Sequence, residues 1–378
     1  MDTSIIFSLV VVVASSAVHL FNFYKKKKKD INQELVLALK SIIGDDAGKA
    51  ANSFKNIKKI YKNSHDINIA LGNLYRQQGN IDKAINLHQS LVTNKYRTKE
   101  KRAEALSELG HDYILAGMYD KAEYIYNELS NYSNYKLLAY NSLISISDYQ
   151  SDWDRAIYYS LSRNRIEDME DKKSLINYYC EKVDIYLQQQ NITNAVKTYK
   201  LATKIGNNHK RLSITGYTLD IKMKQYATAI NKIENLLDED HFYILSSVSD
   251  LYYCYNEISQ TNKFIVKICS YIKNSKSLRI IRCIAKSLID NLDGNELFNL
   301  FSKLAAENKH LDKRFASILK IYLESNKSQS EIIHGIMSTM DLVLTESDYR
   351  CFSCGLDAHI HYWQCPSCRQ WDQIQLRN

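Results

Sequence analysis

The chain begins with an uncharged apolar run and continues in a pattern of helical spacing. Residues 5–24, IIFSLVVVVASSAVHLFNFY, contain no formally charged side chain. A helix of about 20 apolar residues crosses a hydrocarbon core roughly 30 Å thick. We therefore predict an N-terminal transmembrane helix within residues 1–24.

The charges on either side of this run predict its orientation. Asp2 precedes it and five lysines, Lys25 to Lys29, follow it, whereas a cleaved signal peptide carries its positive charges in front. Positive residues beside a membrane helix stay on the cytoplasmic side. With residues 25–34 as a basic linker, we expect a single-pass protein whose bulk is cytoplasmic. The lysines would also attract anionic lipid.

Two segments further along the chain repeat one another. LGNLYRQQGNIDKAINLHQSL (residues 71–91) and LGHDYILAGMYDKAEYIYNEL (residues 109–129) share their spacing of leucine, glycine, tyrosine, glycine and alanine. This is the spacing of tetratricopeptide repeats, which are helical hairpins about 34 residues apart. In the first segment we expect Gly72 and Ala84 to let the helices approach closely, and Gly79 to form the turn between them.

Other positions of the repeat have expected roles of their own. Tyr75 and His88 should fill the groove between hairpins, and Asn80 or Asp82 should cap the second helix. The second-helix alanine marks six hairpins, with separations of 34, 38, 34, 39 and 34 residues. These marks are Ala50, Ala84, Ala122, Ala156, Ala195 and Ala229.

We therefore predict an all-α, superhelical solenoid of tetratricopeptide repeats over residues 35–240. Degenerate helical repeats and a cap follow over residues 241–345, with FIVKICSYI and NELFNLFSKLAAENK as helices. One proline and 11 glycines in 378 residues agree with a helical chain,. Each hairpin of a solenoid packs on its neighbours and leaves one surface free. The predicted role of the repeats is to bind a peptide or a protein.

Composition and motifs narrow the function further. Lys25 to Lys29 supply five charges of a formal net charge of +8, so we expect no nucleic-acid partner. Most of the 28 tyrosines should pack between repeats, with a minority available as interface anchors,. The sequence has no G-x-x-x-x-G-K-[ST], G-x-G-x-x-G, H-E-x-x-H or G-x-S-x-G motif,. We predict that the protein is not an enzyme.

The C-terminal segment YRCFSCGLDAHIHYWQCPSCRQW, within a predicted domain of residues 346–378, has metal-binding spacing. Its two C-x-x-C pairs are separated by ten residues and consist of Cys351, Cys354, Cys365 and Cys368. Four thiolates satisfy a tetrahedral ion and leave no open position for catalysis. We expect one structural metal ion in a rubredoxin-like or zinc-ribbon fold, and zinc rather than iron. Gly355 and Pro366 suit turns whose backbone amides point at the sulfurs.

Neighbouring residues of this tail have other expected roles. His359 and His361 are interpreted as exposed hairpin residues rather than spare ligands. Tyr362 and Trp363 should pack the ribbon against the last repeats, because so small a domain has almost no core. The remaining cysteines lie singly in apolar stretches and are interpreted as core residues in a reducing compartment; they are Cys180, Cys254, Cys269 and Cys283.

The order of anchor, basic run, repeats and four-cysteine tail resembles the lipopolysaccharide assembly protein B family of Gram-negative inner membranes. The resemblance covers essentially the whole chain. It is most specific in the two repeat segments, in SDWDRAI and in the ending, where Y-W-x-C-P-S-C is characteristic. It implies that the four tail cysteines are the metal ligands and that the repeats after residue 35 form the protein-binding body. The denser lysine block and the Asn, Lys and Tyr content of the repeats depart from the family pattern.

The resemblance also implies a function, that of an adaptor in the inner membrane. The adaptor would bring the deacetylase that commits carbon to lipid A to the membrane AAA+ zinc protease FtsH, which degrades it when lipopolysaccharide is plentiful. The membrane helix would contact the protease and an inner-membrane regulator that senses lipopolysaccharide. A general scaffold for lipopolysaccharide-synthesis enzymes is the alternative, and a rubredoxin-like electron carrier is a third, although no flavin or pyridine-nucleotide motif accompanies it. Homo-oligomer formation stays open.

Overall fold

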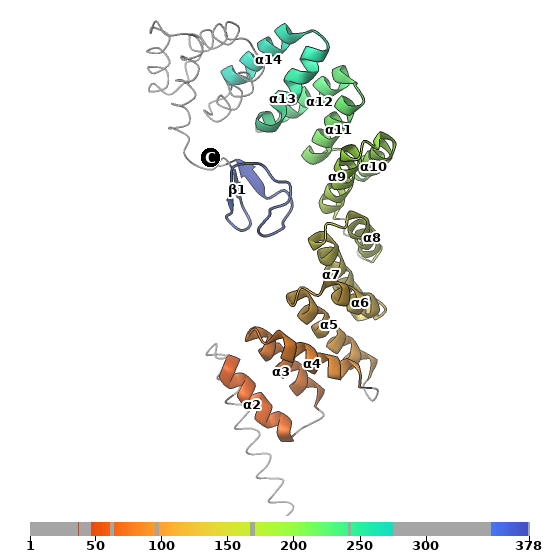
Figure 1. Cartoon of the computed structure of the whole chain (residues 1–378), viewed down its shortest axis with the longest axis vertical. Coiled ribbons are helices and arrows are strands. Elements are labelled where there is room, and N and C mark those ends of the chain that lie inside the picture. The colour runs from red at the N-terminus through yellow and green to blue at the C-terminus, as the bar shows by residue number, and fades with distance from the viewer. Residues whose placement is uncertain are drawn as a thin grey trace, which may run out of the picture. The chain divides into compact units, whose positions relative to one another are not determined.

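The computed structural model describes residues 37, 47–60, 64–94, 98–166, 171–240, 243–274 and 349–376. They belong to two compact units, residues 1–169 and residues 170–378 (Figure 1). The predicted membrane segment and its basic linker lie outside the described residues. Among the residues that are described, no helix combines the length and the apolar character needed to cross a bilayer.

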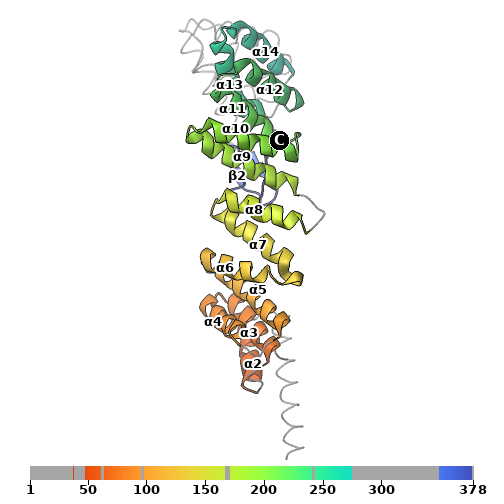
Figure 2. The same ribbon diagram turned by 90° about the vertical axis from the view of Figure 1, so that its right-hand side faces the viewer.

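The described residues of the first unit form the helix α2 followed by three helical hairpins. The helix is α2 (Ala47–Ile60), and the hairpins are α3 (His65–Gln77) with α4 (Ile81–Val92), α5 (Lys99–Leu115) with α6 (Tyr119–Leu129), and α7 (Lys136–Tyr149) with α8 (Trp153–Asn164). A short 3-10 turn, η1 (Ser133–Tyr135), precedes α7. Neighbouring hairpins pack through α4 on α5 and α6 on α7, and Figure 2 shows these helices in chain order.

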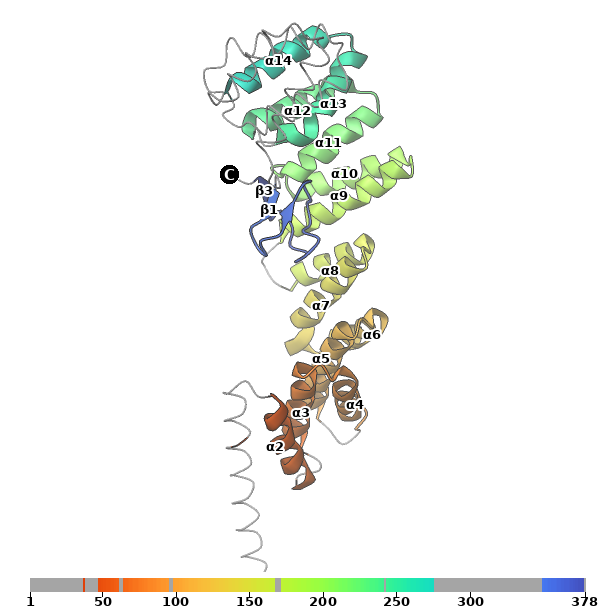
Figure 3. The same cartoon turned by 60° about the vertical axis from the view of Figure 1, so that its left-hand side comes forward.

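In the second unit, the part that the structure describes contains three more hairpins and a small sheet (Figure 3). The hairpins are α9 (Lys172–Gln188) with α10 (Ile192–Ile205), α11 (Lys210–Lys222) with α12 (Tyr226–Glu239), and α13 (Ile244–Glu257) with α14 (Thr261–Asn274). Helix α11 packs on both α9 and α10, and α12 packs on α13. The described residues therefore form the helical hairpins that the repeat spacing predicts.

The alanines that mark the repeat are buried, Ala50 in α2 and the other five in the second helix of their hairpins. All six have no exposed surface, and they are Ala50, Ala84, Ala122, Ala156, Ala195 and Ala229. The register predicted from their spacing is thus confirmed. In α14 the equivalent position is Phe264, which is also fully buried. Helices α13 and α14 form a further hairpin after residue 240, where a degenerate repeat is expected.

One turn geometry joins the two helices of each hairpin. A residue with positive φ lies five positions before the buried alanine or phenylalanine; these residues are Gly79, Gly117, Ser151, Gln190, Lys224 and Ser259, with φ from 54° to 74°. In the first hairpin the N–H of Asn80 donates to the carbonyl of Tyr75 at 2.9 Å. A bond of this kind closes the end of a helix after a left-handed residue.

Capping of the second helix differs from the prediction. The side chain of Asn80 caps no backbone amide of α4; its Nδ2 donates instead to Oε1 of Gln78 at 3.3 Å. Asp82 lies in the first turn of α4, where a carboxylate is stabilised by the positive end of the helix dipole.

Candidate metal centre and its docking surface

The C-terminal domain is a three-stranded antiparallel sheet with two cysteine turns. Strand β1 (Tyr349–Cys351) lies between β2 (Asp357–Ala358) and β3 (Ile374–Leu376), and Cys351 pairs with Ile374. Five buried residues form its core, namely Tyr349, Cys351, Ala358, Cys365 and Ile374. Two of these are the predicted ligands, so the metal site and the core of this domain are one structure.

The structure brings the four predicted ligands together. Their sulfur atoms all lie within 4.8 Å of one another. The sulfurs of Cys351 and Cys368 are 3.7 Å apart, as are those of Cys354 and Cys365. Metal–sulfur bonds of about 2.3 Å in a tetrahedron separate the sulfurs by about 3.8 Å. Four thiols at these distances fit an ion such as zinc or ferrous iron, and the pairs are too far apart to be disulfides.

Backbone amides point at the sulfurs, as the two turns led us to expect. Gly355 adopts φ 78° directly after the first pair, and the N–H of Leu356 lowers the pKa of Cys354 to about 6. Burial raises the pKa of Cys365 to about 11, while the N–H groups of Ser367 and Cys368 act in the opposite direction. Such donors stabilise thiolates and orient them toward an ion.

Two tryptophans attach this domain to the hairpins of the second unit. Trp363 stacks on Tyr243 with ring centroids 6.0 Å apart, and the guanidinium of Arg211 lies over the same indole at 5.2 Å. Trp371 meets Tyr178 edge to face at 5.7 Å. Aromatic pairs of this kind add about 0.5–1.5 kcal/mol each beyond the area that they bury.

A single carboxylate adds the polar part of the contact. Oδ2 of Asp372 accepts from Nδ2 of Asn177 at 3.0 Å and lies 3.2 Å from Nε2 of His209. Asp372 has φ 57°, and its N–H donates to the carbonyl of Trp363 at 2.8 Å. This turn joins the two tryptophan-bearing segments, so the same backbone bond supports both aromatic contacts.

The predicted packing of the ribbon on the repeats is confirmed for Trp363 but not for Tyr362, which is 37% exposed. The partners lie on α9, at the start of α11 and just before α13 rather than on the last hairpin alone. The interpretation of His361 as an exposed residue is wrong. Its ring lies between Tyr349, Tyr243 and Trp363, and burial, with the charge of Arg211 second, lowers its pKa to about 4.

His359 is exposed, as expected, and neither it nor His361 belongs to the sulfur cluster. Two of the single cysteines, Cys180 and Cys254, are fully buried; burial raises the pKa of Cys180 to about 11 and that of Cys254 to about 12. Such thiols are inert core residues. The burial of Cys269 and the position of Cys283 lie outside what the structure describes.

One further group in the described part of the chain has metal-ligating side chains close together. It comprises His65, Asp66 and Glu104. Nε2 of His65 is 2.8 Å from Oε2 of Glu104, which is a hydrogen bond. That bond accounts for the proximity without an ion.

Sequence reasoning missed the helical side of the docking surface. Asn177 and Tyr178 lie on α9 and His209 directly precedes α11, at positions that no motif distinguishes from other polar or aromatic positions of the repeats. Trp371 and Asp372 offered a weak signal, since a large aromatic residue beyond the last knuckle of so small a domain needs a partner.

Comparison with known proteins extends the picture. Residues 349–375 match a family model described as a rubredoxin metal binding domain. The lipopolysaccharide assembly protein B of Escherichia coli strain K12 is 24% identical over 349 residues, covering 91% of this chain and 89% of its own. The protein of the same name from Haemophilus influenzae strain Rd is 25% identical over 372 residues, covering 93% of this chain and 92% of its own.

Solved structures give weaker matches. A crystal structure of MamA protein is 20% identical, covers 47% of this chain and 92% of its own, and has a TM-score of 0.36. The pilF protein of Pseudomonas aeruginosa is 16% identical, covers 56% of this chain and 93% of its own, and has a TM-score of 0.32. Scores this low add nothing to the description of the fold. The resemblance predicted from the sequence motifs is confirmed by the relatives: from its helical repeats to its four-cysteine ribbon, this chain is similar to lipopolysaccharide assembly protein B.

Proposed function

We propose that this chain is a non-catalytic, membrane-anchored adaptor that controls lipopolysaccharide synthesis. The observation that carries the proposal is similarity over nine-tenths of the chain to proteins named for lipopolysaccharide assembly. In this role the hairpins bind a client, the lipid A-committing deacetylase, and present it to FtsH. Residues 1–24 hold the adaptor beside that protease in the inner membrane, with the remainder on the cytoplasmic side, and contact a lipopolysaccharide-sensing regulator.

The four cysteines are proposed as the ligands of one structural metal ion, with zinc preferred to iron. A closed shell of four thiolates has no position for a substrate. The ion would stabilise a domain that covers part of α9 and α11, and the adaptor would therefore need the metal for the shape of its surface rather than for chemistry.

The test is the cellular half-life of the deacetylase with the chain present, depleted, and replaced by a variant lacking residues 1–24. We expect depletion to lengthen the half-life and the anchorless variant not to restore it, although its helical content should be intact by circular dichroism. A half-life that depletion leaves unchanged, with lipopolysaccharide synthesis still impaired, would replace the adaptor by a general scaffold for synthesis enzymes.

The electron-carrier alternative has its own test. Metal analysis of the purified full-length chain should give one zinc per chain and no reversible absorbance change on reduction. Stoichiometric iron whose colour bleaches and returns would favour electron transfer instead.

A further inference from the structure

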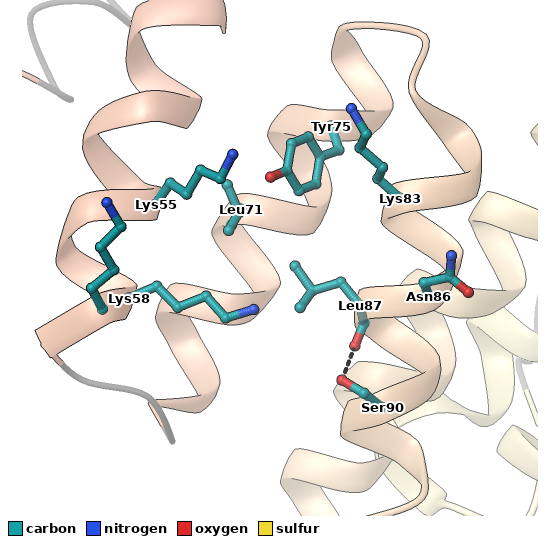
Figure 4. A pocket seen from close by; sticks show the side chains of 9 residues that line it. Lys55, Lys58, Leu71, Tyr75, Lys83, Asn86, Leu87 and Ser90 are labelled. Carbon is teal, nitrogen blue, oxygen red and sulfur yellow. Dashed lines mark hydrogen bonds between the residues drawn. The ribbon is translucent and has the colours of Figure 1, made fainter.

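A basic groove lies in the first unit, away from the metal centre in the sequence. Helices α2, α3 and α4 line an open groove with a volume of about 570 Å³ (Figure 4). Its floor is apolar, formed by Leu71, Leu87 and the ring of Tyr75. Figure 4 shows Lys55 of α2 and Lys83 of α4 on either side of that ring. With Lys58 and Lys59, four lysines line this pocket with its apolar floor, and we call it the lysine groove.

The repeat architecture does not require these lysines. Relative to the buried alanine, they occupy positions +5, +8 and +9 of one hairpin and position −1 of the next. At the next two hairpin junctions of the first unit these four positions are Gln89, Val92, Thr93 and Lys121; then Asn127, Ser130, Asn131 and Arg155. Only the first junction carries a lysine at all four. Packing between hairpins therefore does not require a cation at all four positions.

No carboxylate of the described residues neutralises the groove. Several arginines of the first unit are paired with carboxylates, for example Arg76 with Glu108 at 2.6 Å and Arg102 with Glu128 at 2.6 Å. Lys59 only contacts the amide oxygen of Asn56 at 3.5 Å, and Lys83 lies 5.7 Å from the centroid of the Tyr75 ring. Burial lowers the pKa of Lys58, because its ammonium loses water without gaining a nearby negative charge.

We propose that the lysine groove binds an extended acidic segment of a partner protein, with carboxylates on the lysines and an apolar side chain of the same segment on Leu71 and Leu87. The positive charge of the lysines is the reason to expect carboxylates in the partner segment, and the apolar floor is the reason to expect an apolar side chain. Lysines beside an apolar floor favour a peptide over a bilayer, because an extended segment presents carboxylates and apolar side chains side by side, whereas a bilayer holds its apolar layer beneath its charges. The biological role of this site rests on the adaptor function proposed above, in which the acidic segment would belong to a partner of the adaptor.

Binding can be measured on the full-length chain in a non-ionic detergent. The probe is a fluorescein-labelled peptide of ten residues in which glutamate and leucine alternate, and its partner peptide has glutamine at each glutamate. The groove variant is Lys55→Glu with Lys83→Glu. The matched control is Lys99→Glu with Lys101→Glu, which makes the same charge change at exposed positions of α5 outside the groove.

We expect the acidic peptide to bind more tightly than the glutamine peptide, and the groove variant to raise its Kd by about tenfold or more. The control should change Kd by about twofold or less, and added salt should weaken binding. Leu87→Ala should also weaken binding without any change of charge. Circular dichroism melting curves establish that each variant is folded.

Two results would overturn the proposal. One is an equal effect of the groove and control variants on peptide binding, which would leave only non-specific attraction. The other is binding of dihexanoyl phosphatidylglycerol that the groove variant abolishes, with no binding of the acidic peptide, which would make the groove a lipid-headgroup site. The assay contains neither deacetylase nor protease, so the groove and the adaptor role can fail independently.

Discussion

Gly72 occupies a position with no room for a side chain. A Cβ at this position would lie 2.2 Å from Nε2 of His88, and the His88 ring is fully buried. Gly206 offers a contrast, since a Cβ there would meet only Cδ1 of Ile176 at 3.6 Å, and its φ of −180° is open to any residue. The close helix approach predicted at Gly72 is therefore a contact between the Gly72 backbone and the ring of His88.

We expect Gly72→Ala to lower the free energy of unfolding by about 2 kcal/mol. Forcing a buried ring aside costs up to about 3 kcal/mol, which exceeds the gain of roughly 1 kcal/mol from the better helix propensity of alanine. Gly206→Ala should raise the free energy of unfolding by about 0.5 kcal/mol, because alanine fits this backbone conformation and lowers the entropy of the unfolded chain. Urea unfolding of both variants measures the difference, and equal stabilities would contradict the steric explanation.

At the turns of the hairpins, we expect substitution to glycine to increase stability. Gln190 and Lys224 are exposed and have φ of 58° and 60°, where an L-residue costs about 1–2 kcal/mol. Gly117 fills the equivalent position at φ 69°. Replacing either residue by glycine removes this cost, but increases the entropy of the unfolded chain by an amount worth about 0.5–1 kcal/mol.

Gln190→Gly and Lys224→Gly should each therefore raise the free energy of unfolding, by about 0.5–1 kcal/mol. Gly117→Ala is the reciprocal control and should lower it by a similar amount. Urea midpoints at constant slope are the measurement. A loss of stability in both glycine variants would show that the turn bonds, rather than φ, dominate this position.

These positions also show how far sequence reasoning reaches. Alanine and glycine recur because close helix contacts exclude larger side chains, so their register could be read directly from the sequence. In the α13–α14 hairpin, Ser259 takes the place of the turn glycine and Phe264 that of the buried alanine. The repeat motif is therefore not visible in the sequence of this hairpin. The turn is formed by backbone hydrogen bonds, which do not depend on the side chain, and Phe264 is buried at the position that alanine occupies in the other hairpins.

At the scale of the elements, buried polar groups tie three helices of the first unit together. Oδ2 of Asp112 in α5 lies 2.6 Å from Nδ1 of His88 in α4, and Oδ1 accepts from Arg76 of α3 at 2.8 Å. Asp112 and His88 are fully buried. Arg76 reaches Glu108 as well. The network joins the α3–α4 hairpin to the next one through directional bonds, in addition to apolar packing.

We expect Asp112→Ala to destabilise the first unit by about 3–5 kcal/mol, because Arg76 and His88 would lose a buried acceptor. Asp120→Ala, an exposed position in the first turn of α6, should cost about 0.5 kcal/mol. Thermal unfolding followed by circular dichroism measures the loss of stability in each of the two variants. Similar costs for both variants would mean that water replaces the missing carboxylate.

For the whole molecule, the metal-binding domain shows the limit of prediction from the sequence. The cysteine pairs predicted their own cluster because ligand spacing is local along the chain. The contacts of Asp372 with Asn177 and His209 span 195 and 163 residues, and no pattern along the sequence encodes such a pairing. Physical complementarity between distant surfaces becomes visible only when the chain is folded.

Removal of the metal should release the ribbon from α9 and α11, because metal binding and folding are coupled in a domain of this size. The chain has three tryptophans, so a Trp153→Phe background leaves Trp363 and Trp371 as reporters. We expect Cys354→Ser to reduce the metal content and to shift tryptophan emission to the red, because Trp363 and Trp371 become exposed to water. Treatment of the unmodified chain with a strong chelator should have the same effect. Ser367→Ala, an exposed change on the same ribbon, is the control.

An unchanged emission spectrum after complete loss of metal would contradict the coupling. A shift that appears equally in Ser367→Ala would point to general loosening of the ribbon. Either result is independent of which ion is bound.

The separation of Asn177 from Asp372 also has a consequence during synthesis. A ribosome adds about 5–20 residues per second, so some 10–40 s pass between the two positions. Hairpins fold locally and much faster, which means that Tyr178 and Arg211 face solvent in a nascent chain that is otherwise folded. Until the ribbon emerges and acquires its ion, that uncovered surface distinguishes an unfinished molecule from a finished one.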